Sequence, residues 1–272
     1  MKKNWLYNKT VIITGASSGF GKILATRFIK DFNCKVIGVA RNIDKLNALK
    51  EELGENFITY PFDVSVKENW ESLKKYLMDK SVAVDILINN AGVMPPFAKF
   101  DYFSDEEIEK TFNINFLSYL YSIKTFLPVL ENSSTPAIIN VSSLAGLVPV
   151  VGASIYCASK GAVRFFTEAI EEEYRKKIYV AGIYPGFSKT NLFSEHNIDK
   201  KSDKMFDLIA TKPEKAVNKM VRKLKRKKKR IVIGKDAFLL RLLYFFFPKS
   251  ANKIVSFFFK KSKLTFFDKL FK

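Results

Sequence analysis

The sequence has little of what several classes of protein depend on. Its two cysteines, Cys34 and Cys157, lie far apart and form no C-x-x-C pair, so neither a disulfide framework nor a cysteine-bound metal is expected. The single histidine, His196, is expected in a solvent-exposed loop. No apolar run reaches the roughly 20 residues that a membrane-spanning helix needs. With no room for a signal peptide before the first apolar segment, these shortages favour a cytoplasmic protein that holds no metal.

Acidic residues are scarce in one part of the chain only. Residues 219–272 contain 18 Lys and Arg against two acids, Asp236 and Asp268, which gives a balance of +16. The other 28 basic and 25 acidic residues leave residues 1–218 at only +3. We therefore predict a catalytic domain over 1–234 and a basic, aromatic-rich C-terminal extension over 235–272.

The body alternates short β-branched segments with longer segments whose apolar residues recur at helical spacing. Strands that are apolar on both faces and separated by helices indicate a parallel sheet covered on both sides. We predict one doubly wound α/β domain with a mostly parallel, seven-stranded, Rossmann-like sheet. The predicted strands are Val11–Thr14, Lys35–Val39, Phe57–Phe62, Asp85–Asn89, Ala137–Ser142, Ile178–Tyr184 and Arg230–Ile233. The predicted helices are Lys22–Asp31, Lys67–Met78, Glu106–Leu130, Ala158–Arg175 and Pro213–Lys225.

A glycine-rich turn, Thr14–Gly21, follows the first predicted strand. Its glycines permit a tight turn, a close approach of backbone to pyrophosphate, and close packing of the next helix. An ordinary turn between strand and helix is the alternative, but the position at the first strand favours a dinucleotide site. The turn residues predicted to bind the dinucleotide are Gly15, Ser17, Ser18, Gly19, Phe20 and Gly21.

The end of the second strand bears on which dinucleotide binds. An acid there would bind the 2′-hydroxyl of NAD, whereas a cation accommodates the 2′-phosphate of NADP. The sequence has Ala40 followed by Arg41, so NADP is favoured and NAD is less expected. If Arg41 is only a solvated loop residue, the missing acid still weakens the case for NAD.

Two further strand ends carry polar or small residues. Asp63, followed by Val64, can place a carboxylate against an exocyclic amine such as that of adenine, or can cap the next helix. Asn90, Ala91 and Gly92 follow the fourth strand, where small residues let the backbone approach a ligand or simply stabilise the sheet.

Acid–base chemistry is indicated by the segment Tyr156–Lys160. Its tyrosine and lysine are four positions apart and so share one face if the segment is helical. Ser143 lies thirteen residues upstream, just after the apolar run Ala137–Val141. Together with a phosphate-binding turn, this set favours hydride transfer to or from a nicotinamide cofactor.

In order and spacing, these segments resemble the short-chain dehydrogenase/reductase family over about residues 8–235. The resemblance implies a single Rossmann-like domain that interconverts a ketone or aldehyde and an alcohol. The matching segments are Thr14–Gly21, Asn89–Gly92, Asn115, Ser143, Tyr156–Lys160, Pro185, Gly186 and Thr190.

The resemblance also implies roles for four catalytic residues. Tyr156 is expected to be the general acid in reduction and the base in oxidation, and Lys160 to lower the pKa of its phenol. Ser143 would bond the substrate oxygen, and Asn115 would hold a water that links Lys160 to solvent. The weaker candidates at these last two positions are Ser142 and Asn113. The residues expected at the nicotinamide half are Tyr156, Lys160, Pro185, Gly186 and Thr190.

The substrate is predicted to be lipophilic, because the resemblance implies a lid over residues 187–212 that is rich in apolar residues. Segments around Asn115 and Ser143 are similar to hydroxysteroid, retinol and sphingoid-base reductases, without choosing among them. The family also implies a homo-oligomer. The alternative function is a catalytically idle dinucleotide sensor or scaffold, although every catalytic position holds the expected residue. The apolar lid residues are Phe187, Leu192, Phe193, Met205, Phe206, Leu208 and Ile209.

Three roles are open to the extension. Its aromatic and basic residues suit peripheral docking on an anionic membrane surface, packing over the substrate entrance, or burial in an oligomer interface. Projected as a helix, Lys253–Lys272 has no clean apolar face. We favour membrane contact over structural packing, and expect no nucleic-acid partner because no recognition motif accompanies the charge.

Overall fold

Seven parallel strands form the centre of this computed structural model, which describes residues 4–190, 192, 210–262 and 270. Their order is β3-β2-β1-β4-β5-β6-β7, and every neighbouring pair is parallel. The predicted doubly wound fold is confirmed, and each predicted strand lies within one residue of an observed one. The strands are β1 Thr10–Thr14, β2 Lys35–Ala40, β3 Phe57–Pro61, β4 Ile86–Asn89, β5 Ala137–Val141, β6 Tyr179–Pro185 and β7 Arg230–Ile233.

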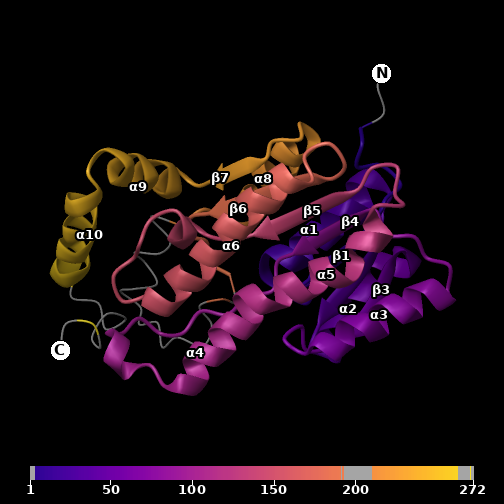
Figure 1. The fold of residues 1–272 in the computed structure, drawn as a ribbon, viewed down its shortest axis with the longest axis horizontal. Helices are drawn as coiled ribbons and strands as arrows, with labels where there is room; N and C mark the ends of the chain where they lie inside the picture. The colour runs from indigo at the N-terminus through magenta and orange to yellow at the C-terminus, as the bar shows by residue number, and fades with distance from the viewer. Residues whose placement is uncertain (1–3, 191, 193–209, 263–269, 271–272) are drawn as a thin grey trace.

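Helices cover both faces of the sheet (Figure 1). α1, α2 and α8 share one hydrophobic cluster with the sheet, and α3, α5 and α6 share the other. The helices are α1 Gly19–Phe32, α2 Ile43–Leu53, α3 Lys67–Asp79, α4 Asp105–Phe112, α5 Ser118–Leu130, α6 Ser154–Glu173, α8 Pro213–Lys225, α9 Lys235–Phe246 and α10 Pro248–Ser262. Single 3-10 turns occur at Gly54–Asn56, Phe100–Tyr102 and Leu144–Gly146.

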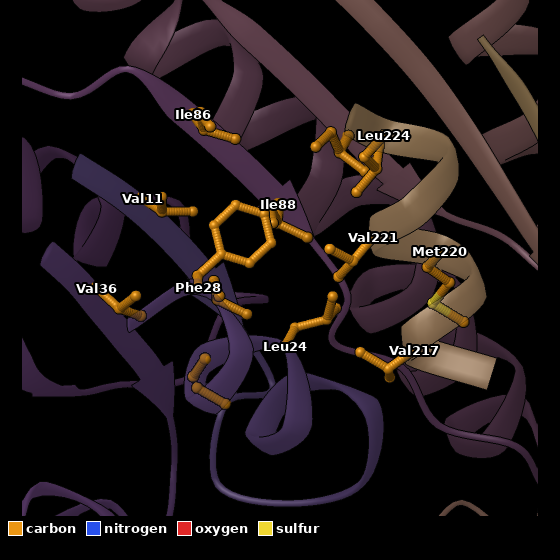
Figure 2. Close-up of a cluster of buried hydrophobic side chains, with 14 of the residues drawn as sticks. Val11, Leu24, Phe28, Val36, Ile86, Ile88, Val217, Met220, Val221 and Leu224 are labelled. Atoms are coloured by element: carbon orange, nitrogen blue, oxygen red, sulfur yellow. The ribbon is translucent and has the colours of Figure 1, made fainter. Parts of the chain in front are cut away.

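Alternation along the strands separates the two clusters. In β1, Val11 and Ile13 lie in the same cluster as Phe28 of α1, whereas Ile12 lies with Trp70 of α3 on the opposite face. Figure 2 shows the first cluster, where side chains of α1 and α8 meet over the strands. Both faces are therefore buried, which explains why the strands are continuous apolar runs.

The long helix predicted over Glu106–Leu130 is wrong in its middle. The chain forms α4 and α5 with a π-helical turn, Asn113–Leu117, between them. A capping box of Ser104 and Glu107 starts α4. The extra residue of a π turn reorients the side chains that follow, and such turns are frequent at functional sites. A helical pattern read at 3.6 residues per turn does not detect it.

The helix α2 was not predicted, because six of its eleven residues are polar or charged and its apolar stripe is short. A signal was nonetheless present in the sequence. The side chain of Asn42 caps the helix by accepting a hydrogen bond from the backbone N–H of Lys45 at 2.8 Å.

The described part of the extension consists of α9 and α10, which lie at the opposite end of the molecule from α2 and α3 (Figure 1). α9 packs on the body through Ala237, Leu240 and Tyr244, in a cluster with Leu144 and Leu147. In the part of the chain that the structure describes, no helix is both long and apolar enough to cross a membrane.

Candidate active site

A pocket lies at the carboxyl ends of the strands, where the order of the sheet reverses between β1 and β4. In open α/β sheets this reversal leaves a crevice in which ligands bind. Its lining combines the glycine-rich turn, the end of β4, the end of β5, the start of α6 and the end of β6. The residues predicted from sequence that line it are Gly15, Ser18, Gly19, Phe20, Asn90, Ala91, Gly92, Ser143, Tyr156, Lys160, Pro185, Gly186 and Thr190.

The glycine-rich turn closes on itself so tightly that two of its positions admit no side chain. A Cβ added at Gly21 would lie 2.1 Å from the carbonyl oxygen of Gly15 and 2.7 Å from Nδ2 of Asn90. Gly15 itself has φ +67°, which favours glycine. Thr14, which sequence reasoning did not single out, fastens the turn to β4: its hydroxyl oxygen accepts from the backbone N–H of Asn90 and Ala91 at 2.8 and 2.9 Å.

The start of α1 fits a phosphate. The first turn of the helix contains no acid, and the side chain of its N-cap, Ser18, makes no capping hydrogen bond. The N–H groups of the first helical residues lack partners within a helix, and together with the helix dipole they favour an anion. Ser17 lies in the same turn and is half-buried, and Gly21 is buried.

A second hollow contains Arg41 and Asp63. Arg41 is exposed, and Oδ1 of Asp63 accepts hydrogen bonds from the backbone and the side chain of Ser65 at 2.9 and 2.6 Å. Burial acts to raise the pKa of Asp63, but the Ser65 bonds and the charges of Arg41 and Lys110 lower it below its usual value. Asp63 thus remains ionised and has its other oxygen for a donor such as an amine, while Val64 is buried in the core.

Tyr156 and Ser143 meet inside the pocket. Tyr156 is only 5% exposed, and the side chain of Ser143 lies close enough to act on its pKa. Burial raises the pKa of Tyr156 to about 12, against a smaller lowering by Ser143. Ser143 also accepts from the N–H of Ala145 at 3.1 Å, whereas Ser142 turns away and donates to the carbonyl of Lys160 at 2.7 Å.

Lys160 is buried beneath the pocket, with its Nζ 3.1 Å from the carbonyl oxygen of Val141 and 3.5 Å from Oη of Tyr119. Burial lowers the pKa of Lys160 to about 7. Desolvation lowers the pKa of Lys160 and raises that of Tyr156 in this structure. The expected lowering of the Tyr156 pKa by Lys160 stays a prediction.

Replacing Lys160 with Met should change how stability depends on pH. Because its pKa is about 7 when folded and about 10.5 when unfolded, Lys160 binds fewer protons in the folded state between these values. Its contribution to the free energy of unfolding therefore increases as the pH rises. From pH 7 to 9, the free energy of unfolding of wild type should increase relative to that of Lys160→Met by about 1.4 kcal/mol per pH unit. Urea unfolding at both pH values measures the difference; parallel curves would exclude a buried lysine with a depressed pKa.

Asn115 lies behind the pocket rather than in its lining. Its side chain exchanges two hydrogen bonds with the backbone of Val93, at 2.8 and 2.9 Å, and donates to Oγ of Ser159 at 3.0 Å. Its Oδ1 and Nζ of Lys160 would each lie 3.2 Å from a Cβ added at Gly92, so the two groups flank the same glycine. Asn113 lines the second hollow instead.

Tyr119 is a site residue that sequence reasoning missed. It is 1% exposed, its ring lies 5.3 Å from Nζ of Lys160, and its hydroxyl lies 3.0 Å from the carbonyl oxygens of Ala91 and Val141. It therefore links β4, β5 and the lysine. A signal existed in its spacing, since Tyr119 follows Asn115 by four residues in a segment predicted to be helical.

One wall of the pocket is apolar, and residues of the extension pack against the side chains that form it. Tyr156 shares a cluster with Met94, Phe97 and Leu270, the last only 7% exposed. Phe259 of α10 packs edge-on against Phe97, with ring centroids 6.2 Å apart. Phe187 and Leu192 of the predicted lid also join this cluster. The other apolar lid residues (Phe193, Met205, Phe206, Leu208 and Ile209) and His196 lie outside the described residues.

Comparison with known proteins bears directly on this arrangement. Residues 9–201 match the model of the family described as short chain dehydrogenase. An uncharacterized oxidoreductase of Staphylococcus aureus strain MRSA252 is 32% identical over 71% of this chain and 83% of its own length. An NADP-dependent 3-hydroxy acid dehydrogenase of Salmonella typhi is also 32% identical, over 72% of this chain and 81% of its own length.

Solved structures give the same picture of the fold. The closed form of a serine dehydrogenase complexed with NADP+ has a TM-score of 0.76 and 28% sequence identity, covering 82% of this chain and 94% of that one. A short-chain dehydrogenase from Streptomyces avermitilis has a TM-score of 0.77 at 24% identity, which supports the fold.

Proposed function

The chain belongs to the short-chain dehydrogenase family, and is therefore an oxidoreductase with the fold of NAD(P)-dependent enzymes; from this premise we propose that it is an NADP-preferring enzyme that interconverts a lipophilic ketone or aldehyde and its alcohol. The observation that carries the proposal is the meeting of Ser143 and Tyr156 inside a pocket at the sheet reversal, above the buried Lys160. One relative is described as NADP-dependent and one structural neighbour was solved with NADP+, which supports this preference, while two other neighbours were solved with NAD or NADH.

The residues present divide the chemistry of carbonyl reduction among themselves. The bound nicotinamide supplies the hydride. Ser143 holds the substrate oxygen, and Tyr156 donates a proton to it from Oη. A pKa of about 12 keeps that proton in place at neutral pH, which suits the acid needed for reduction. Lys160 positions the cofactor ribose, and Asn115 supports the loop that follows β4.

The lining of the pocket supports an uncharged, lipophilic substrate. Among the described residues that line it, Lys160 is the only charged one, and it lies beneath the pocket rather than in the apolar wall. A carboxylate substrate such as a 3-hydroxy acid or serine would need a second cation or other strong donors. Steroid, retinoid and long-chain keto compounds instead match the apolar wall.

A substrate panel tests this proposal. Oxidation of NADPH is followed with steroid, retinoid and long-chain ketones, and with short 3-keto acids as the charged comparison. Turnover of the apolar ketones in preference to the acids supports the proposal. Preference for the acids would overturn the lipophilic class, and turnover of neither would favour the idle sensor or scaffold.

Cofactor preference should shift when the end of β2 is changed. In the double variant Ala40→Asp/Arg41→Ser, a carboxylate can accept from the 2′-hydroxyl of NAD and repels the 2′-phosphate of NADP. Loss of a charge-assisted phosphate contact alone corresponds to roughly tenfold or more in affinity. The ratio of kcat/KM for NADPH to that for NADH should fall accordingly. An unchanged ratio would place the 2′-phosphate away from Arg41.

A further inference from the structure

The helix α9 has two apolar faces, and only one of them packs on the body. Ala237, Leu240 and Tyr244 face inwards. On the opposite side, five large apolar side chains fall within an arc of about 120° at 100° per residue. Each of them is between 44% and 75% exposed. They are Phe238, Leu239, Leu242, Phe245 and Phe246.

This exposed face is unusual for a helix on a protein surface. Such a helix normally turns its polar side to solvent and its apolar side to the core. Phe247, at the corner between α9 and α10, is 59% exposed and continues the apolar surface. Contiguous apolar surfaces of this kind mark sites of interaction with a partner or a membrane.

The exposed charged residues of α9 and α10 are all basic. Six basic residues of 235–262 are exposed, and the one acid of this range, Asp236, is turned into the body. Its Oδ2 accepts from the backbone N–H of Phe187 at 2.6 Å, and its carboxylate lies against Gly186 and Gly234. The basic residues are Lys235, Arg241, Lys249, Lys253, Lys260 and Lys261.

We propose that α9 and α10, here called the C-terminal platform (residues 235–262), dock the protein on an anionic phospholipid surface. The apolar side chains of α9 would enter the boundary between headgroups and acyl chains, while the basic residues bind the anionic headgroups. Phe257 and Lys261 illustrate the pairing, since Nζ of Lys261 lies 5.9 Å from the ring centroid of Phe257. This inference does not depend on the proposed reaction.

A second copy of the chain fits the platform less well than a lipid surface. A symmetric dimer through this face would set the same surface against itself. The cations around it would then approach one another, and like charges across an interface oppose association. An anionic bilayer complements both the aromatic and the basic side chains.

Sedimentation with vesicles tests the proposal on the full-length protein. Vesicles of phosphatidylcholine alone are compared with vesicles that also contain phosphatidylserine, at low and at high salt. Binding should require phosphatidylserine and weaken as salt rises. In Arg241→Gln/Lys249→Gln, binding at low salt should fall roughly 25-fold, since each basic residue near the surface contributes about fivefold. Absence of binding to the anionic vesicles at low salt overturns the proposal.

Aromatic variants separate docking from general stickiness. Phe238→Ser/Phe245→Ser should lower vesicle affinity by about tenfold or more, because two apolar side chains no longer insert. The control is Phe165→Ser, which removes a 67%-exposed phenylalanine of α6 and should leave binding unchanged. An equal loss in the control overturns the proposal. So does a wild-type dimer, seen by analytical ultracentrifugation, that Phe238→Ser/Phe245→Ser dissociates. Thermal unfolding checks that each variant is folded.

Discussion

Tyr156→Phe should lower kcat for ketone reduction by a factor of about 10²–10⁴, the range expected when a general acid is removed. The substitution deletes only the hydroxyl that meets Ser143, so the ring keeps its place in the apolar cluster with Met94 and Phe97. Affinity for NADP and the thermal unfolding temperature should therefore stay close to those of wild type. Steady-state kinetics with NADPH and a lipophilic ketone give the comparison.

A matched control for this experiment is Tyr179→Phe. The hydroxyl of Tyr179 donates to the carbonyl of Lys228 at 2.7 Å, at the opposite end of β6 from the pocket. Turnover of this variant should equal that of wild type. If Tyr156→Phe retained more than about a tenth of wild-type kcat, another group would have to supply the proton.

Gly21→Ala should disable cofactor binding and destabilise the fold together. Its Cβ would lie 2.1 Å from the carbonyl oxygen of Gly15, a backbone atom that can move only if the turn opens. Overpacking of this kind costs about 1–3 kcal/mol of stability. Since the same turn is proposed to hold the pyrophosphate, the Kd for NADP should increase by roughly tenfold or more. Calorimetric titration and thermal unfolding measure the two effects.

Gly161→Ala makes the same chemical change, but it should increase stability and leave cofactor binding unchanged. Gly161 is inside α6, and a Cβ there would meet no atom within 4 Å. Alanine is favoured over glycine in a helix by about 0.5–1 kcal/mol, so this variant should be more stable than wild type and should bind NADP equally well. If both alanine variants behaved alike, the close approach of Gly21 to Gly15 would not be what matters.

The sheet could be predicted well because its signals are local and strong. Most strands are short β-branched runs buried on both faces, and each predicted boundary lies within one residue of the observed one. The predicted pocket residues are also brought together by the topology, since parallel strands place all their carboxyl ends at one edge. Residue roles within the pocket stay predictions that the kinetic experiments test.

What sequence reasoning missed depends on contacts between distant segments. The π turn at Asn113–Leu117 contains Asn115, whose side chain accepts a hydrogen bond from the backbone of Val93, 22 residues away. The pKa of Tyr156 is raised by burial, and composition does not show how deeply a side chain is buried. In the extension, only Lys253–Lys272 was projected as a helix. This segment does not include α9, which has the exposed apolar face.

The π turn also limits how this protein can change through insertion and deletion. Removing one residue from Asn113–Leu117 would rotate all of α5 by about 100° relative to α4. Tyr119 would then leave Val141 and Lys160, and the hydroxyl of Ser122 would leave Asn89, to which it donates at 2.7 Å. Single-residue length changes should therefore be far rarer here than point substitutions, because one lost residue would displace a whole row of buried polar contacts at once.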